Sequence, residues 1–241
     1  MIAFIVQARM TSTRLPGKVM RPVLGKPLLE YQIERLSKVP DIDKIIIATT
    51  SNDTDQPIID FCVSRGLSFF RGSETDVLSR YYGAAVQYGV STIIRVTSDC
   101  PVIDPEVLTD LIRLFRSEPN IDYASNTLER SFPRGLDAEI FTFTALENAQ
   151  MNATTSFQRE HVTPYFYQNP HLFALKSLKC AHDYSAFRLT VDTAEDLQLI
   201  TELITEMYPH KPAFGLEDII ELFRRRPELA NINSHVEQKK N

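Results

Sequence analysis

The sequence predicts an α/β fold in which a mostly parallel sheet carries helices on both faces. Short, continuously apolar and β-branched runs alternate with amphipathic stretches of helical periodicity. Continuously apolar strands are typical of parallel sheets, because helices cover both faces of such sheets. From about residue 120 the alternation becomes irregular. We therefore expect a small α+β extension in the second half of the chain.

Strands and helices alternate regularly in the first half. The apolar runs at 2–6 and 44–49 are predicted strands, and the helix at 27–39 between them carries apolar residues at i, i+4 and i+7. The further elements predicted in this half are a helix at 57–65 closed by Gly66, a strand at 67–70, a helix at 74–88, a strand at 92–97 and a helix at 105–116 that begins with proline.

The second half is less regular. The polar stretch 125–137 is predicted to be a loop, followed by a strand at 139–143 and a helix at 156–168 that is interrupted at Pro164. The remaining predicted elements are strands at 173–178 and 187–191, helices at 193–208 and 216–225, and a polar tail at 234–241. Because no repeat or linker interrupts the pattern, we expect a single domain over 1–241 in which residues 125–180 form the extension.

The composition excludes several classes of protein. The 241 residues carry 26 Lys and Arg against 31 Asp and Glu, so a formal charge of −5 offers no basic footprint for a nucleic-acid backbone. No apolar run approaches the roughly 20 residues that cross a bilayer, and the apolar segment 2–6 is too short for a signal-peptide core. Cys62, Cys100 and Cys180 are widely spaced and suggest neither disulfides nor a zinc site. We expect a cytoplasmic protein with no membrane insertion and no nucleic-acid partner.

The N-terminal segment is basic although the chain as a whole is acidic. No acid precedes Glu30, and Arg9, Arg14 and Lys18 directly follow the first strand, with hydroxyl side chains between them. Open α/β sheets bind ligands at the carboxyl ends of their strands. Cations, hydroxyls and backbone N–H groups together suit a polyanion such as a triphosphate. The alternative is a solvated basic loop.

Two familiar phosphate-binding motifs are absent from this segment. A Walker A loop would require glycine at position 12 and serine or threonine at position 19, where Ser12 and Val19 stand. The dinucleotide pattern G-x-G-x-x-G does not occur. Any phosphate site here is therefore of another kind.

Two aspartates end predicted strands and are candidates for a metal site. Asp99 follows the strand at 92–97, and Asp192 follows the strand at 187–191. Magnesium prefers one or two carboxylates together with phosphate oxygens and waters. The alternatives are a helix N-cap for Asp192, a cap that Thr193 can supply instead, and an Asx turn for Asp99. Beside the basic loop, the pair predicts a Mg²⁺ site.

These segments resemble those of a known family. The run Ala8-Arg9-x-x-Ser12-x-Arg14-Leu15-Pro16-x-Lys18, followed by Gly25-Lys26-Pro27-Leu28-Leu29, is similar to the signature of the cytidylyltransferases that make CMP-Kdo and CMP-acylneuraminate, and most closely to the SpsF-like branch of spore coat polysaccharide biosynthesis. The segments Asp99-Cys100-Pro101 and Asp192-Thr193-Ala194-Glu195-Asp196-Leu197 resemble its metal-binding segments, with Ala194 in place of the usual proline.

The resemblance runs over nearly the whole chain and implies both fold and activity. The fold would be Rossmann-like, of the nucleotide-diphospho-sugar transferase type. The activity would be a Mg²⁺-dependent transfer of CMP from CTP to an acidic sugar or small phosphorylated acceptor, with release of pyrophosphate, in surface polysaccharide or glycoconjugate biosynthesis. Family members often dimerise through the extension, so the resemblance also implies a homodimer.

The resemblance assigns roles to individual residues. The catalytic set would be Arg9, Arg14, Lys18, Asp99 and Asp192, of which Asp99 and Asp192 would bind the metal. The nucleotide would be bound by Ala8, Arg9, Ser12, Arg14, Lys18, Thr49, Arg71 and Thr97. The acceptor would be bound by Asn126, Arg134, Asp137, Glu139, Arg159, Glu160, His161 and Arg188.

Several of these assignments have structural alternatives. Thr49 could be an ordinary strand terminus, and His161 a helix histidine with an internal hydrogen bond. Arg80, near Arg71 in the sequence, suits a surface helix position equally well. The pair Asp53 and Asp55 mimics the Asp-x-Asp of glycosyltransferases only weakly. A glycosyltransferase that uses a nucleotide-sugar and a catalytically silent nucleotide-binding protein are the alternative functions.

Overall fold

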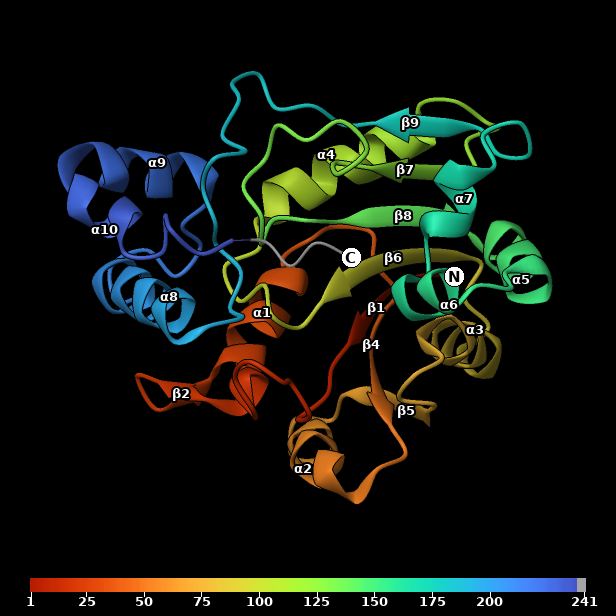
Figure 1. Cartoon of the computed structure of the whole chain (residues 1–241), viewed down its shortest axis with the longest axis horizontal. Coiled ribbons are helices and arrows are strands. Elements are labelled where there is room, and N and C mark those ends of the chain that lie inside the picture. Colours follow the sequence, from red (N-terminus) through yellow and green to blue (C-terminus); the bar gives the residue numbers. More distant parts are fainter. Residues whose placement is uncertain (238–241) are drawn as a thin grey trace.

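A computed structural model describes residues 1–237 of the chain (Figure 1). Its centre is one seven-stranded sheet, and a small two-stranded sheet lies beside it. The strands of the large sheet are β1 (Ile2–Gln7), β4 (Lys44–Thr50), β5 (Ser68–Gly72), β6 (Thr92–Thr97), β7 (Tyr123–Ser125), β8 (Glu139–Thr142) and β9 (Leu175–Ser177). The small sheet pairs β2 (Pro22–Val23) with β3 (Lys26–Pro27).

The large sheet has a parallel half and a mixed half. Its order is β5-β4-β1-β6-β8-β7-β9, and the first four strands pair in parallel. Strand β8 runs antiparallel to both β6 and β7, whereas β9 is parallel to β7. The carboxyl ends of β5, β4, β1 and β6 therefore meet at one edge, which is where such sheets bind ligands.

Helices cover both faces of the sheet, as the sequence predicts (Figure 1). One face packs against α1 (Leu28–Leu36), α2 (Gln56–Arg65) and α4 (Pro105–Arg116). The other packs against α3 (Val77–Tyr88), α5 (Phe143–Asn152) and α7 (Pro164–Gln168), with α6 (Ser156–His161) beside α3. Side chains of a strand alternate between the two faces, so Phe4 and Val6 enter the first core and Ala3 and Ile5 the second. The mostly parallel α/β fold is confirmed.

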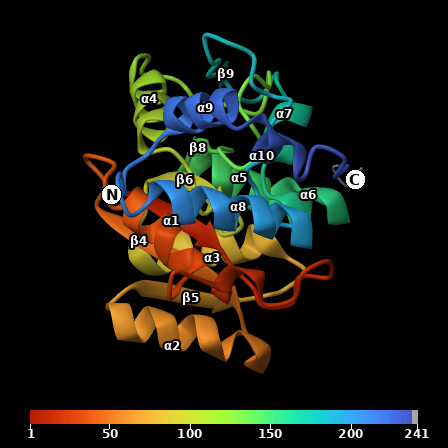
Figure 2. The ribbon, with the colours of Figure 1, turned by 90° about the vertical axis from the view of Figure 1, so that its left-hand side faces the viewer.

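The C-terminal helices form a third apolar cluster next to α1 (Figure 2). They are α8 (Ala194–Met207), α9 (Leu216–Arg225) and α10 (Pro227–Asn231). Elsewhere in the fold, two short 3₁₀ turns lie at Lys18–Met20 and Asp53–Asp55. A buried bond from Arg35 Nη1 of α1 to the carbonyl of Phe214 measures 2.7 Å and joins this cluster to the sheet layer. Within residues 1–237, no helix has the length and apolar character needed to cross a bilayer.

The second half departs from the sequence prediction in several elements. The predicted strand at 187–191 is wrong: the segment forms only an isolated bridge between Arg134 and Arg188. Its Leu189 and Val191 are apolar because the third cluster buries them. The sequence also missed β7, α5 and α10, and β9 is shorter than predicted. The break at Pro164 is confirmed, since α6 and α7 are separate helices. Residues 238–241 of the predicted tail lie outside the described part.

Candidate active site

A pocket of about 230 Å³ lies at the carboxyl ends of β1 and β6, between the loop 9–18 and helices α3 and α6. Many of the residues that the sequence assigned to substrates come together here, although they are distant in the chain. The pocket is lined by the predicted residues Ala8, Arg9, Ser12, Arg14, Lys18, Thr97, Asp99, Glu160, His161 and Asp192.

An ion cluster forms one wall of this pocket. The Lys18 ammonium lies 2.9 Å from Asp99 Oδ2 and 2.8 Å from Asp192 Oδ1, and it also donates to the carbonyl of Val191 at 2.6 Å. The other oxygen of Asp192 pairs with Arg14 Nη2 at 2.9 Å and Arg188 Nη2 at 2.7 Å. Burial opposes both charges, yet the carboxylates raise the pKa of Lys18, and Lys18 with Thr97 lowers the pKa of Asp99. Lys18 and Asp99 are therefore both charged at neutral pH.

Asp192 is free to face the pocket because its neighbours satisfy the start of α8. Thr193 is the N-cap of that helix and forms a capping box with Asp196, as the sequence allowed. Asp196 is fully buried, accepts the backbone N–H groups of Asp192 and Thr193, and pairs with Arg188 Nε at 2.9 Å. Arg188 thus links the helix start to the pocket carboxylate.

Asp99 is held by the end of β6 and by the segment that precedes α8. Thr97 Oγ1 donates to Asp99 Oδ1 at 2.5 Å, and the backbone N–H of Val191 donates to the Asp99 carbonyl at 2.8 Å. The neighbouring Cys100 is 2 % exposed, and burial together with Asp99 raises the pKa of its thiol. A thiol that stays protonated is a poor nucleophile, so Cys100 is a packing residue.

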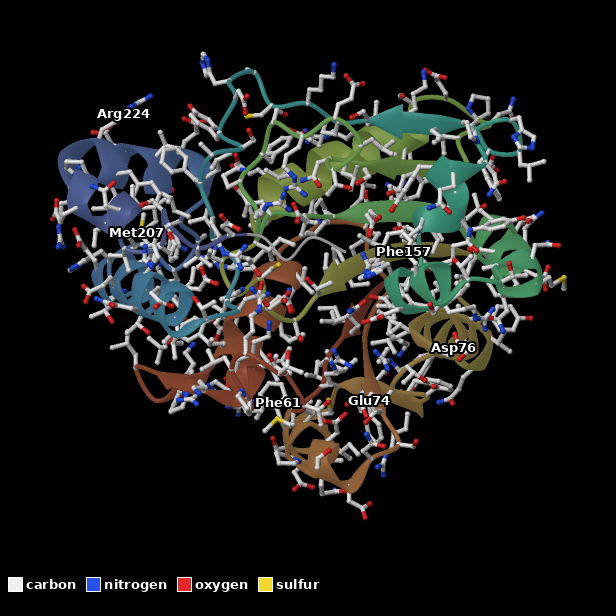
Figure 3. All side chains as sticks on the ribbon, in the orientation of Figure 1. Phe61, Glu74, Asp76, Phe157, Met207 and Arg224 are labelled. Carbon is white, nitrogen blue, oxygen red and sulfur yellow. The ribbon has the colours of Figure 1, made fainter. Side chains whose placement is uncertain are left out.

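Two acidic residues that the sequence interpretation undervalued hold the loop 9–18. Asp55 is fully buried and accepts the backbone N–H of Met10 at 2.7 Å. Glu74 accepts a short hydrogen bond from Thr11 Oγ1 and pairs with Arg9 Nη1 at 3.6 Å; Figure 3 shows it at the connection between β5 and α3. The sequence signal for Asp55 was its spacing from Asp53.

Two predicted nucleotide residues do not line the pocket. Thr49 is fully buried and donates to Asp55 Oδ2 at 3.0 Å. Arg71 folds over the end of β4, where its Nη2 donates to the carbonyl of Ser51 at 2.9 Å and its Nε to the carbonyl of Thr50 at 3.2 Å. Both side chains shape the backbone around the loop that precedes α2.

Several predicted acceptor residues are bound within the protein and lie outside the pocket lining. Asn126 donates to the carbonyl of Leu136 and accepts the N–H of Ala138. Asp137 pairs with Arg130, and Glu139 pairs with Arg95 and accepts from Tyr123. Arg159 pairs with Asp76 and donates to the backbone carbonyl of Gln150. Arg134 lines a smaller neighbouring pocket together with Arg188.

The ion cluster fits the donor set of Mg²⁺. Carboxylate oxygens of Asp99 and Asp192 converge on one point, at present filled by the Lys18 ammonium. No group of three or more His, Cys, Asp or Glu side chains in residues 1–237 could hold a metal, which excludes an all-protein cage in that part of the chain. Two carboxylates that leave other positions for phosphate oxygens and waters are what Mg²⁺ prefers.

Comparisons with known proteins identify the family to which the chain belongs. The family model of the cytidylyltransferases matches residues 3–240. The chain is 40% identical over 238 residues to an uncharacterized protein of Methanocaldococcus jannaschii, covering 98% of this chain and 95% of that protein. It is 34% identical to the spore coat polysaccharide biosynthesis protein SpsF of Bacillus subtilis, covering 95% and 96%.

A solved structure gives the same result for the fold. A cytidylyltransferase from Leptospira borgpetersenii superposes with a TM-score of 0.91 at 32% identity, over 100% of this chain and 99% of that one. Since the family model spans almost the entire sequence, the chain belongs to the cytidylyltransferase family.

Proposed function

We propose that the protein transfers CMP from CTP to an acidic sugar or other small acidic acceptor with release of pyrophosphate, and that it serves the synthesis of a surface polysaccharide or glycoconjugate. The observation that carries this proposal is the ion cluster, in which Lys18 lies between Asp99 and Asp192 beside a basic loop. The likeness to SpsF supports the proposed biosynthetic context.

Each cation of the loop has a carboxylate partner in the free protein. Arg9 pairs with Glu74, Arg14 with Asp192, and Lys18 with both Asp99 and Asp192. Bound triphosphate offers these cations stronger, multiply charged partners. We infer that Arg14 and Lys18 turn from the aspartates onto phosphate oxygens when the nucleotide enters.

Asp99 and Asp192 would hold Mg²⁺, which supplies neutralisation of charge on the reacting phosphate and lowers the pKa of the attacking hydroxyl. The side chains of the protein position the phosphates and neutralise their charge. Arg14 and Lys18 neutralise the departing pyrophosphate, and the loop that Asp55 anchors keeps the chain of phosphates in line. Phosphoryl transfer needs little covalent participation by the protein, which agrees with the inert Cys100.

The acceptor side is formed by residues of the extension and by Arg188 in the segment that precedes α8. Glu160 and His161, at the end of α6, line the same pocket as the ion cluster. Arg134 and Arg188 line the adjoining smaller pocket, and Arg188 also contacts Asp192. Two arginines next to the reacting position suit an acceptor that carries a carboxylate or phosphate.

The test is pyrophosphate release with each of the four nucleoside triphosphates, Mg²⁺ and a panel of acidic acceptors. We expect release with CTP that depends on acceptor, and a loss of at least about 100-fold in Asp99→Asn and Asp192→Asn with no loss of fold. Asp110→Asn on the exposed side of α4 is the matched control. Near wild-type turnover in both active-site variants, or turnover of a UDP-sugar without use of CTP, would contradict the proposal.

A further inference from the structure

Arg80 of α3 is a buried arginine in the wall of the nucleotide pocket. Arg80 is only 2 % exposed and lines the pocket, so the surface helix position that the sequence left open for it is wrong. The guanidinium forms no ion pair among residues 1–237. Its Nη1 donates to the carbonyl of Ser73 at 2.5 Å, while its Nε is buried and has no hydrogen-bond partner. Arg159 and Arg188, by contrast, each pair with aspartate.

An unpaired charge in this position is costly. A guanidinium does not lose its proton in proteins, and burying it without a counter-charge is strongly unfavourable. Burial, the largest effect, and the neighbouring Arg9 lower the pKa of Arg80, and the charges of Asp55 and Glu74, which form no ion pair with it, offset only part of this. Buried polar groups that remain unsatisfied in a native structure require an explanation, and a ligand that supplies the missing acceptors is one.

The local structure is arranged to hold Arg80 in place. Gly72, the last residue of β5, leaves room for its aliphatic stem: a Cβ on Gly72 would lie 3.1 Å from Arg80 Cγ and 3.4 Å from Arg80 Cβ. The Ser73 carbonyl then fixes one side of the guanidinium. The opposite edge carries Nε and Nη2, and neither atom has a hydrogen bond within residues 1–237. Nε and Nη2 form a planar pair of parallel donors.

The position of Arg80 indicates which part of the nucleotide meets this edge. Helix α3 packs on β5 and β4, in the parallel half of the sheet, which is the half that binds a mononucleotide in such folds. Arg14 and Lys18 are already placed beside Asp99 and Asp192 for the phosphates. Next to Arg80, Val77 is 5 % exposed and gives the pocket an apolar surface for a ring.

We propose that Arg80 donates from Nε and Nη2 to the adjacent N3 and O2 acceptors of cytosine and so selects CTP over UTP. Uracil carries a hydrogen on N3, which would face the guanidinium donors. Arginine reads pairs of acceptors on a neutral base in the same bidentate manner in protein–DNA complexes. The inference rests on the proposed function for the presence of a cytidine nucleotide, and it adds the residue that reads the base.

The experiment compares kcat/KM for CTP and for UTP in the same enzyme preparation. In Arg80→Gln we expect the CTP/UTP ratio to fall by about 5- to 150-fold, the discrimination of one good bidentate base contact. Arg80→Lys keeps the charge but not the paired donors, so its ratio should fall as well. Arg113→Gln, an exposed arginine of α4, is the matched control. Because both nucleotides are measured on one variant, a general loss of active protein cancels in the ratio.

A second variant and a binding measurement protect the test against misfolding and inactivity. Gly72→Ala crowds Arg80 without removing it and should lower the ratio less than Arg80→Gln. By calorimetry, Arg80→Gln should weaken binding of CMP and leave pyrophosphate binding unchanged, which needs no turnover and so does not depend on the proposed reaction. An equal loss for CTP and UTP, weakened pyrophosphate binding, or a raised KM for the acceptor alone would overturn the assignment.

Discussion

The parallel and mixed halves of the sheet use their polar residues in different ways. At the carboxyl edge of the parallel half, Arg9, Lys18 and Asp99 project from strand ends and loops into a common pocket. In the extension, Asn126 and Glu139 face inward and are bound by the protein itself. The first set is available to substrates, and the second holds the fold together.

The difference has a physical cause in the backbone. The loops that follow parallel strands lie at the edge of the sheet, where water or a ligand can satisfy their polar groups. Part of the segment between β7 and β8, including Asn126, Leu136 and Ala138, is buried without regular pairing, so its backbone groups need side-chain partners. Asn126 supplies both, since it donates to the carbonyl of Leu136 and accepts the N–H of Ala138. Polar side chains in a buried irregular segment therefore tend to bond to the backbone and hold the fold, whereas those at strand ends remain available to a ligand.

The largest expected effect is that of Lys18→Met, which removes the centre of the pocket cluster. Lys18 bridges two carboxylates, so its loss leaves Asp99 without a cationic partner. We expect pyrophosphate release to fall by about 100- to 1,000-fold. Free Mn²⁺, followed by its spin-resonance signal without nucleotide, should bind more tightly to this variant, because no ammonium competes for the two oxygens.

The control for this variant is Lys38→Met, a lysine exposed at the end of the α1 region, which should match wild type in both measurements. Near wild-type pyrophosphate release in Lys18→Met would remove Lys18 from the site. Unchanged Mn²⁺ affinity would mean that the ammonium and the metal do not share one position.

The sequence predicted the parallel half well because its signals are local. Apolar runs placed β1, β4 and β6, and the strand ends placed Arg9, Lys18 and Asp99. It could not predict that Leu189 and Val191 are buried by helices instead of neighbouring strands, since an apolar run looks alike in both settings. Helix α5 was missed because its buried side is short and formed mainly by Ala145, Leu146 and Ala149.

The site shows the same division between local and distant information. Motif spacing identified the cations and carboxylates of the pocket. The partners that hold them, Asp55 for the loop and Asp196 behind Arg188, depend on contacts between distant segments. Whether Arg159 faces a substrate or Asp76 depends on how α6 packs on α3, which no spacing reveals.

A second prediction tests the structural assignment of the extension. Glu139 is 6 % exposed, pairs with Arg95 and accepts from Tyr123 at 2.6 Å. Removing one partner of a buried pair leaves the other charge uncompensated, so Glu139→Gln should lower the free energy of unfolding by about 3 kcal/mol in denaturant titrations. Adding Arg95→Met should restore part of that loss. A raised KM for the acceptor with unchanged stability would place Glu139 in the binding site and break the comparison.

The smallest expected effect concerns a polar cluster outside both halves, where Lys26, Glu34 and Tyr208 tie α1 to α8. Lys26 Nζ lies 2.5 Å from Glu34 Oε1, and Tyr208 donates to the other oxygen at 2.6 Å. Although burial opposes both charges, these bonds lower the pKa of Glu34 and raise that of Lys26. The Glu34 side chain is 37% exposed, so solvent screens the pair and Glu34→Gln should cost only about 0.5 kcal/mol.

The pH dependence of this small effect follows from the directions in which the pKa values of Glu34 and Lys26 are shifted. The stability that Glu34 contributes is present above the pKa of 4.5 that it has in the unfolded chain. It is lost as the pH falls through the lower pKa of Glu34 in the folded protein. The stability that Lys26 contributes is present below the pKa of 10.5 that it has in the unfolded chain. It is lost as the pH rises through the higher pKa of Lys26 in the folded protein. The stability difference between wild type and Glu34→Gln should thus be constant through neutral pH and shrink at both extremes, whereas Glu221→Gln on α9 should show almost none. A difference as large as that of Glu139→Gln would mean that the number of bonds, and not burial, sets the strength of these clusters.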